Sequence, residues 1–247
     1  HTAPFFTADP QDPRQLVGRT LGSVDMEDLK GKTALVTGAS TGIGAAVALA
    51  YAAQGMHVAV HYNSSVDAAQ KVVDSIRAEG GQAFGYASDA RKEEDVAALF
   101  TQIEAEHGPV EVLVFNIGAN VPCSILDETA RKYFKIWEMA CFSGFLNAQA
   151  AARRMVERGR GTILFTGATA GLRGSANFAA FAGAKHALRA LAQSVARELG
   201  PRNIHVAHVV VGGAIDTDFI RTQFPERYAL KDQGGILNPD HIAENYW

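Results

Sequence analysis

A glycine-rich turn between a buried strand and a helix constrains the fold of this chain more than any other feature. The segment TALVTGASTGIGAAVALAYA, residues 33–52, passes from an apolar stretch into a helical one and places Gly38, Gly42 and Gly44 at the junction. Glycine allows a tight turn and a close approach of backbone to a ligand, while the first helical N–H groups favour an anion. The pattern predicts a dinucleotide pyrophosphate site. The alternative is a turn that is tight for packing reasons alone.

Apolar strands and amphipathic helices alternate along the chain from Lys32 onward. We expect strands at 33–36, 57–62, 82–86, 110–115, 161–165 and 205–211. Helices are expected near 44–54, 66–79, 93–107 and 178–199, with a further helical stretch at 130–157 that divides into two. Continuously apolar strands that alternate with helices indicate a parallel sheet covered on both faces. The predicted fold is α/β, a doubly wound Rossmann-type parallel sheet in three αβα layers.

Length and composition fit one globular domain preceded by an arm. The 247 residues are 47% hydrophobic and 20% charged, which is ordinary globular composition. Residues 1–30 hold three of the eight prolines and show no sustained periodicity. We therefore expect a surface arm over residues 1–30 and a single dinucleotide-binding domain over residues 31–247.

Charge, hydropathy and cysteine content exclude several classes of function. A formal net charge of -3 without a basic stripe argues against nucleic acid as a partner. The most apolar helical run, residues 45–53, is about half the length that a membrane crossing needs, and the N-terminus shows no signal segment. Cys123 and Cys141 have the spacing of neither a metal site nor a disulfide framework. We expect a cytoplasmic protein with a small-molecule substrate, no metal and no membrane contact.

The glycine turn and several later motifs, taken in order, resemble the short-chain dehydrogenase/reductase family from Lys30 to about Asp218. The resemblance implies that the aspartate of SDA, Asp89, lies by the adenine, that Asn116 and Gly118 in FNIGAN line the cofactor, and that Ile215 and Thr217 hold the carboxamide. Asp89 has a second interpretation as a helix cap before RKEEDV. With the turn and the end of the second strand, the predicted cofactor-binding set is Gly38, Ser40, Thr41, Gly42, Ile43, Gly44, Tyr62, Asn63, Ser64, Asp89, Ala90, Asn116, Gly118, Lys185, Ile215 and Thr217.

The end of the second predicted strand bears on the choice of dinucleotide. In this fold an acidic side chain at that point binds an unphosphorylated ribose. Here VAVHYNSS ends in Tyr62, Asn63 and Ser64, and Asp67 comes too late. Amide and hydroxyl groups donate to a 2′-phosphate that an acid would repel. NADP(H) is predicted, and NAD(H) remains the alternative because no basic residue reinforces the choice.

The catalytic positions that the resemblance implies depart from the family's pattern. Family members carry a tyrosine one helical turn before a lysine, a serine further upstream and an asparagine on the preceding helix. In this sequence Lys185 falls on the lysine, whereas Phe181, Ala168 and Cys141 fall on the other three positions. We therefore predict Lys185 as the catalytic residue. The predicted substrate pocket consists of Cys141, Ala168, Arg173 and Phe181.

Phe181 offers neither a proton nor a hydrogen bond to an alkoxide, and positioned proton transfer is usually worth about 10²–10⁴-fold in rate. A displaced hydroxyl at Thr166, Thr169 or Ser175 stays open. Other side chains also have two interpretations each. Cys141 is a proton donor or a small apolar filler, Arg173 binds an acidic substrate or is solvated, and His186 is a base or a helix-surface contact.

Three functions follow from these departures. The first is an NADP(H)-binding oxidoreductase with non-standard proton delivery, acting on C=N or activated C=C or C=O substrates. The second is a catalytically silent dinucleotide-binding protein, a sensor or a partner subunit. The third is a non-redox isomerase or cyclase on the same scaffold. A deep apolar cavity over the nicotinamide favours the two enzymes, whereas side chains filling that space favour the silent protein.

Assembly and the end of the sheet complete the expectations. Leu188, Leu191, Val195 and Leu199 fall at helical spacing, so we expect a homodimer or homotetramer through this face, unless the face only covers the sheet. The family usually continues beyond NPDHIAENYW through a helix and a last strand. Either a last strand lies outside this sequence, or the N-terminal arm or a partner covers that edge. A substrate lid is expected after Thr217 without a predicted position.

Overall fold

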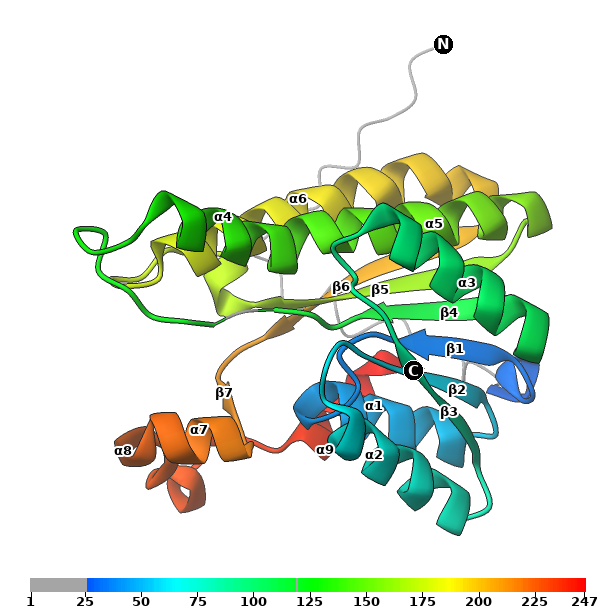
Figure 1. Ribbon diagram of the computed structural model, residues 1–247, viewed down its shortest axis with the longest axis horizontal. Coiled ribbons are helices and arrows are strands. Elements are labelled where there is room, and N and C mark those ends of the chain that lie inside the picture. Colours follow the sequence, from blue (N-terminus) through cyan, green and yellow to red (C-terminus); the bar gives the residue numbers. More distant parts are fainter. Residues whose placement is uncertain (1–25, 119) are drawn as a thin grey trace, which may run out of the picture.

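Six parallel strands form one sheet through the middle of the molecule (Figure 1). The computed structural model describes residues 26–118 and 120–247, so residues 1–25 of the expected arm lie outside the described part. The strands are β1 (Thr33–Val36), β2 (His57–Tyr62), β3 (Gln82–Ala87), β4 (Val110–Phe115), β5 (Gly161–Ala168) and β6 (Ile204–Val211). Their order in space is β3-β2-β1-β4-β5-β6, which puts the topological switch point between β1 and β4. Ligands bind at such a switch point, outside the carboxyl ends of the strands.

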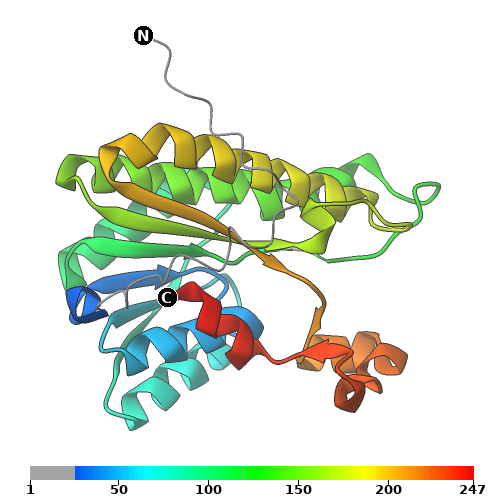
Figure 2. The same ribbon diagram turned by 180° about the vertical axis from the view of Figure 1, so that it is seen from behind.

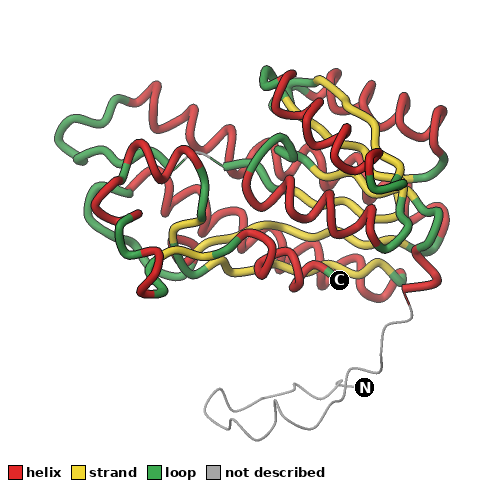
Figure 3. Tube along the Cα trace, turned by 90° about the horizontal axis from the view of Figure 1, so that it is seen from below, coloured by secondary structure: helices red, strands yellow, loops and turns green. Residues whose placement is uncertain are grey.

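Helices cover both faces of the sheet, as Figures 1 and 2 show from opposite sides. One face carries α1 (Gly42–Ala53) and α2 (Val66–Ala78), and the other carries α3 (Glu93–His107), α5 (Ser143–Arg158) and α6 (Ala179–Leu199). Successive strand residues point to opposite faces. On β1, Ala34 and Val36 join the core under α1 and α2, whereas Leu35 joins the core under α3, α5 and α6. The predicted doubly wound α/β fold is confirmed, and Figure 3 shows the strands as a layer between helices.

The helical stretch expected at 130–157 divides into two helices at an unusual turn. α4 (Ala130–Trp137) ends in a π-helical segment, Glu138–Phe142, from which α5 continues. π-helical turns inside helices occur often at functional sites because they shift the side chains that follow. This turn carries Cys141, which is buried. The apolar periodicity predicted that the helical stretch divides into two, but it did not predict a π-helical turn.

The strand expected at 161–165 extends to Ala168, because its last three residues pair with β6. The register runs from Gly161 opposite Ile204 to Ala168 opposite Val211. The apolar pattern stops at Phe165, after which Gly167 and Ala168 are too small to mark a strand by hydropathy. The carboxyl end of β5 is therefore Ala168, at the edge of the sheet where the carboxyl ends of the strands lie.

The residues after β6 form a small lobe and then return to α1. The lobe contains β7 (Ala214–Ile215), α7 (Asp218–Gln223), α8 (Pro225–Tyr228) and β8 (Ile236–Leu237), and lies beyond the carboxyl ends of the strands (Figure 1). After α9 (Pro239–Ala243), Tyr246 is 3% exposed, and its carbonyl oxygen accepts a hydrogen bond of 2.6 Å from Tyr51 Oη. Tyr246 Oη and Thr166 Oγ1 are 2.7 Å apart. The end of the chain therefore contacts β5 at Thr166, which also lines the cavity described next.

The apolar face expected to mediate assembly packs inside the molecule. Leu188 and Leu199 are buried in the core between α6 and the sheet, and Leu191 and Val195 are half-buried against it. This face therefore covers the sheet. The homo-oligomer stays a prediction that this face does not support. Within residues 26–118 and 120–247, β6 pairs with β5 alone, so the edge expected to be open has no described strand beside it. No helix of the described part is long and apolar enough to cross a membrane.

Candidate functional site

The glycine turn between β1 and α1 leaves no room for side chains at two of its positions. Gly38 has a φ of +59°, and a Cβ there would lie 2.7 Å from the Asn116 carbonyl oxygen. A Cβ at Gly44 would overlap the Gly38 carbonyl oxygen and lie 2.8 Å from Asn116 Nδ2. The turn and the end of β4 are therefore in contact, because glycine alone allows this approach. This contact forms one side of the switch-point crevice.

The first turn of α1 presents free backbone donors beside this turn. Its N-cap residue, Thr41, makes no side-chain capping hydrogen bond, and its first turn contains no acidic residue. The first N–H groups of a helix have no partner within the helix, and the helix dipole adds positive charge there. Thr217 lies next to the turn, since a Cβ at Gly42 would be 3.2 Å from Thr217 Cγ2. The arrangement fits a bound anion such as a pyrophosphate.

A buried histidine on β2 supports the turn from behind. The Gly38 N–H donates to His61 Nδ1 at 3.3 Å, and His61 Nε2 lies 3.1 Å from both the carbonyl and the hydroxyl oxygen of Ser88. Burial lowers the pKa of His61 to about 4, so the ring is neutral and can accept with one nitrogen and donate with the other. We did not predict His61, because a histidine within an apolar strand matches no motif. Its signal is a polar ring on a strand that is covered on both faces.

The ends of β2 and β3 place the residues predicted near the adenosine. Tyr62 is half-buried, while Asn63 and Ser64 are exposed at the carboxyl end of β2. The Asp89 carboxylate accepts two hydrogen bonds of 2.8 Å from Arg91, which hold its pKa at about 2. The interpretation of Asp89 as the cap of α3 is wrong, because the N-cap residue is Lys92. The residue is bound by a neighbouring guanidinium instead.

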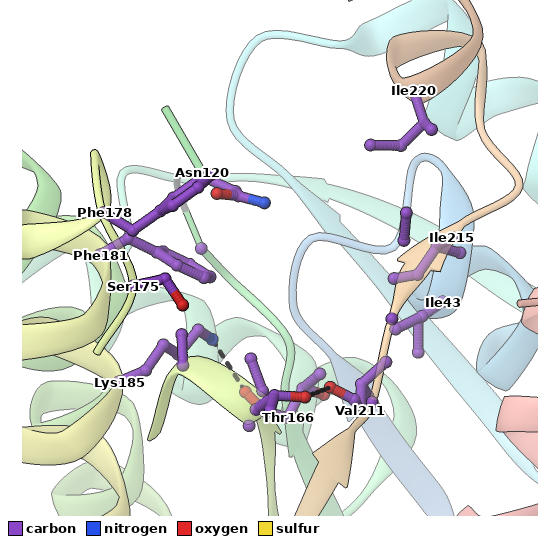
Figure 4. Close-up of a pocket in the computed structure, with 18 of the residues that line it drawn as sticks. Ile43, Asn120, Thr166, Ser175, Phe178, Phe181, Lys185, Val211, Ile215 and Ile220 are labelled. Atoms are coloured by element: carbon purple, nitrogen blue, oxygen red, sulfur yellow. Dashed lines mark hydrogen bonds between the residues drawn. The ribbon is translucent and has the colours of Figure 1, made fainter. Parts of the chain in front are cut away.

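A cavity of about 670 Å³ lies between the carboxyl ends of the strands and the lobe of α7 and α8. Of the predicted site residues, eight line it: Ile43, Asn116, Gly118, Ala168, Arg173, Phe181, Lys185 and Ile215. The other predicted residues lie outside its lining: Gly38, Ser40, Thr41, Gly42, Gly44, Tyr62, Asn63, Ser64, Asp89, Ala90, Cys141 and Thr217. Figure 4 shows Phe178, Phe181 and Lys185 on one wall, opposite Ile43 and Ile215.

Lys185 is the buried ionisable side chain of this cavity. It is 4% exposed, and its Nζ donates a hydrogen bond of 2.9 Å to the Thr166 carbonyl oxygen (Figure 4). Burial lowers the pKa of Lys185 to about 8, against the opposing effect of nearby Cys141. The Phe181 ring centroid is 5.8 Å from Nζ. Near pH 8 this amine is therefore present in both protonation states, as a group that gives or takes protons requires.

Of the three hydroxyl side chains that could replace the tyrosine hydroxyl, Ser175 has the most suitable position. Thr166 Oγ1 is bound to Tyr246, and Thr169 Oγ1 donates to the Val211 carbonyl oxygen at 3.4 Å. Ser175 lines the cavity, and Figure 4 shows its hydroxyl directed toward the side where Lys185 lies. Ser175 is thus the hydroxyl whose position suits contact with a ligand.

Two further candidates lie away from the cavity. Burial raises the pKa of the Cys141 thiol, while nearby Lys185 lowers it. Because Cys141 is 7% exposed and does not line the cavity, its interpretation as an apolar filler fits better than that of a proton donor. His186 is exposed on α6, with Nδ1 2.8 Å from the Ala182 carbonyl oxygen, and it too is absent from the lining. Its role as a helix-surface contact is the one the structure bears out.

Several lining residues were not predicted. They include Asn120, Val121 and Phe178 and, from the lobe, Phe219, Ile220, Phe224 and Arg227. The lid was expected after Thr217, but its sequence FIRTQFPERY has no motif that distinguishes a wall residue from a solvated one. The available signal was its large apolar side chains in an otherwise polar segment, of which Phe219 is 51% exposed. Exposed apolar residues at a cavity mouth commonly contact ligands.

His208 on β6 is a second histidine that sequence reasoning missed. Its ring explains why residue 167 is a glycine. A Cβ on Gly167 would overlap His208 Cε1 and Nε2. The buried Nε2 has no hydrogen-bond partner among the described residues, and burial and the charge of Lys185 lower the pKa of His208. The neutral ring thus occupies the space that a larger residue at Gly167 would need.

Replacing Gly167 by alanine is expected to destabilise the protein, because the new methyl group overlaps the His208 ring. Overpacking of this kind costs about 1–3 kcal/mol. The double variant Gly167→Ala, His208→Ala should recover much of that loss, because the two sites are in contact. Urea unfolding of both single variants and the double variant measures the coupling. Additive effects would contradict the proposed contact.

A match to a known family follows from the sequence and agrees with this geometry. The family profile described as short chain dehydrogenase matches residues 32–227. The chain belongs to the short-chain dehydrogenase/reductase family. Short-chain dehydrogenases/reductases are oxidoreductases that bind NAD(P) and act on small molecules. The cradle formed by the glycine turn and the free donors of α1 fits that cofactor.

Solved structures of this family resemble the chain over most of its length. A short-chain dehydrogenase from Rhodopseudomonas palustris is 42% identical, with 88% of this chain and 91% of that chain covered and a TM-score of 0.74. A short-chain dehydrogenase from Burkholderia cenocepacia J2315 in complex with NADP is 32% identical, with coverages of 88% and 89% and a TM-score of 0.79. A 7α-hydroxysteroid dehydrogenase complexed with NADH and 7-oxo glycochenodeoxycholic acid is 33% identical, with coverages of 88% and 86% and a TM-score of 0.79. Both dinucleotides thus occur among these relatives.

Proposed function

We propose that this chain is an NADP(H)-dependent oxidoreductase that reduces an imine or an activated C=C or C=O bond with non-standard proton delivery. One observation carries the proposal. Above the cofactor cradle lies a cavity whose wall combines Phe181 with a single buried ionisable group, Lys185, among the residues that the structure describes there. In this proposal Phe181, Ala168 and Cys141 stand where relatives carry tyrosine, serine and asparagine.

The chain's own groups divide the work as follows. The turn around Gly38 and the first N–H groups of α1 bind the pyrophosphate, and Asn116 and Gly118 at the end of β4 line the nicotinamide side. When bound, the nicotinamide supplies a hydride. Phe181 excludes water from the reacting bond and gives no proton. Lys185 holds a proton at Nζ, which the Thr166 carbonyl oxygen orients.

The choice of acceptor follows from which side chains can supply a proton. A simple ketone needs an acid to stabilise its developing alkoxide, and Phe181 provides none. A protonated imine carries its own charge, and an activated alkene delocalises charge away from the site of hydride addition. A lysine with a pKa of about 8 is well matched to protonate such an anion near neutral pH. These acceptors therefore suit the cavity better than an unactivated ketone.

The preference for NADP(H) rests on the end of β2. Asn63 and Ser64 are exposed there and offer donors to a 2′-phosphate, whereas the carboxylate of Asp67 lies in the first turn of α2. Arg91, on the adjoining edge, is bound to Asp89 and adds no free cation. The preference is a proposal about the free energy of binding, and NAD(H) is its direct competitor.

The size of the cavity favours an enzyme over a silent dinucleotide-binding protein. Side chains that filled the space over the nicotinamide would favour a sensor or partner subunit. The cavity of about 670 Å³, which a bound nicotinamide would share with an acceptor, falls within the range of small-molecule sites, about 300–1,000 Å³. Phe181 lines this space without closing it. A non-redox isomerase or cyclase would use the same cavity, so turnover must separate it from the oxidoreductase.

Titration with NADPH and NADH, followed by nicotinamide fluorescence, tests the first half of the proposal. We expect tight binding with NADPH preferred. A panel of ketones, imines and enones added to the same sample then tests the second half through NADPH oxidation. Turnover on imines or enones supports the proposal. Binding without turnover on any acceptor would point to the silent protein or to non-redox chemistry, and failure to bind either nucleotide would overturn the cofactor assignment.

The pH dependence of turnover should report Lys185. Its ammonium form predominates below pH 8, so enone reduction is expected to fall as the pH rises through about 8. Lys185→Met should lower kcat by about 10²–10⁴-fold and abolish this limb of the profile. The measurement is kcat from pH 6 to 10, with the NADPH dissociation constant of each variant determined separately. An unchanged limb in Lys185→Met would assign the pKa to another group.

A further inference from the structure

The cavity has an unbalanced positive charge at its mouth. Three cationic side chains line it, Arg173, Lys185 and Arg227, and no aspartate or glutamate does so among the described residues. Arginine stays protonated at any pH at which the protein is folded. Lys185 is buried, whereas both arginines are exposed to solvent and so belong to the outer part of the lining, which we call the mouth. The charge at the mouth therefore comes from two residues that the proposed chemistry does not use.

Among residues 26–118 and 120–247 no acid forms an ion pair with Arg227, because the neighbouring acids are bound elsewhere. Asp216 accepts a hydrogen bond of 2.7 Å from Tyr228 Oη and lies 2.6 Å from Lys231 Nζ, and Asp218 lies 2.8 Å from Arg221. The contact of Tyr228 with Asp216 also anchors α8, so the backbone of Arg227 is held in place. Adjacent residues of a helix do not face each other, and Glu226 does not line the cavity.

Arg173 reaches the mouth from a separate element with a fixed backbone. The N–H groups of Leu172 and Arg173 both donate to the Thr169 carbonyl oxygen, at 2.9 and 3.2 Å. Gly171 packs against α6, since a Cβ there would lie 3.0 Å from the Lys185 carbonyl oxygen. The segment 168–178 contains no acidic residue. The solvated interpretation of Arg173 assumed a lone arginine, and the structure brings a second one to the same cavity.

The cavity wall also carries large apolar side chains. Phe178, Phe219, Ile220 and Phe224 supply aromatic and aliphatic surface there. Burying such surface stabilises an apolar ligand, while a guanidinium fork binds a carboxylate through two charge-assisted hydrogen bonds. The two features recognise different ends of one molecule.

We propose that the substrate is an apolar small molecule carrying a carboxylate, which Arg173 and Arg227 bind at the mouth while the reducible bond lies over Lys185. This inference rests on the proposed function and specifies its substrate class. The arginines act in binding and not in the chemical step. They should therefore affect KM and ligand affinity more than kcat.

A matched pair of probes tests the inference without requiring turnover. Benzalacetone bearing a para carboxylate, and its methyl ester, share the same enone and ring and differ in charge. Calorimetric titration into the complex with NADP⁺ measures the dissociation constant of each. We expect the acid to bind about 10- to 100-fold more tightly than the ester, the range of one or two charged hydrogen bonds.

Variants assign the preference to the two arginines. Arg173→Gln and Arg227→Gln should each weaken acid binding about tenfold or more, with the ester and NADP⁺ unchanged. Arg221→Gln is the matched control, because Arg221 lies in the same lobe, pairs with Asp218 and does not line the cavity. Raised salt should weaken binding of the acid alone.

The outcomes separate the two proposals. Equal affinity for acid and ester, binding of neither probe, or variants that weaken NADP⁺ instead of the acid would each overturn this inference. An acid preference that depends on both arginines, in a protein that reduces no acceptor, would uphold the inference about binding and remove the proposed oxidoreductase. Turnover of the ester as readily as the acid would uphold the proposed oxidoreductase and remove the inference about binding.

Discussion

Replacing Gly44 by alanine is expected to reduce NADPH affinity by about 10- to 100-fold or more, which corresponds to an overpacking cost of roughly 1–3 kcal/mol. The added Cβ would overlap the Gly38 carbonyl oxygen and lie 2.8 Å from Asn116 Nδ2 and 2.9 Å from Ala39 Cα. Two of these neighbours are backbone atoms of the turn, so relief requires the proposed anion-binding turn itself to move. Fluorescence titration with NADPH measures the loss.

Gly200→Ala is the matched control for this variant. It makes the same chemical change at a position where a Cβ would meet nothing within 4 Å and where the backbone is right-handed. Its NADPH affinity and melting temperature should stay close to those of the parent protein. Gly44→Ala with parental affinity would contradict the role of this turn as the pyrophosphate cradle.

Replacing Phe181 by tyrosine is expected to raise NADPH-dependent reduction of simple ketones by about 10²–10⁴-fold, the usual value of positioned proton transfer. Phe181 lines the cavity one helical turn before Lys185, and the Lys185 Nζ is 5.8 Å from its ring centroid. A hydroxyl on this ring would point its proton into the cavity, and the nearby ammonium would lower the pKa of the phenol. Steady-state rates on ketones and on enones measure the gain.

Phe178→Tyr controls for the chemical change itself. Phe178 lines the same cavity, so a tyrosine there adds the same hydroxyl away from the proposed proton-donor position. A gain confined to Phe181→Tyr would locate the missing proton donor. Equal gains from both variants, or none in a protein that does reduce enones, would contradict the proposed alignment of the catalytic positions.

The two pairs of variants test different layers of the proposal. Gly44 concerns whether a dinucleotide binds, and Phe181 concerns what happens to the acceptor once it has bound. A protein that fails the first test cannot be interpreted in the second. Suppose that the Gly44 test confirms dinucleotide binding and that Phe181→Tyr gains ketone activity. A few side chains at the end of β5 and on α6 would then determine the chemistry of this chain.

The strands and helices could be predicted from the sequence because their signals are local. Apolar runs and helical spacing gave β2, β4 and α3 at the same bounds that the structure has. The glycines of residues 38–44 predicted the turn because left-handed backbone and close backbone contact both exclude other residues. Each of these signals lies within a window of a few residues. The doubly wound fold and the cofactor cradle follow from them.

The substrate side of the site depends on contacts between residues far apart in the chain. His61 supports Gly38, Tyr246 binds Thr166, and His208 fills the space over Gly167. None of these pairs has a spacing that periodicity or turn chemistry would reveal. Side chains meet in such pairs only after the sheet order and the packing of helices on it are set.

The sequence by itself thus determined the parallel sheet, the position of the glycine turn and the presence of Lys185 one helical turn after Phe181. Only the tertiary structure decided that Lys185 is buried, that Cys141 lies outside the cavity, and that Arg173 and Arg227 share its mouth. The physical reason is that backbone conformation responds to neighbouring residues, whereas burial, pKa and the shape of a cavity depend on which surfaces come together in the folded chain.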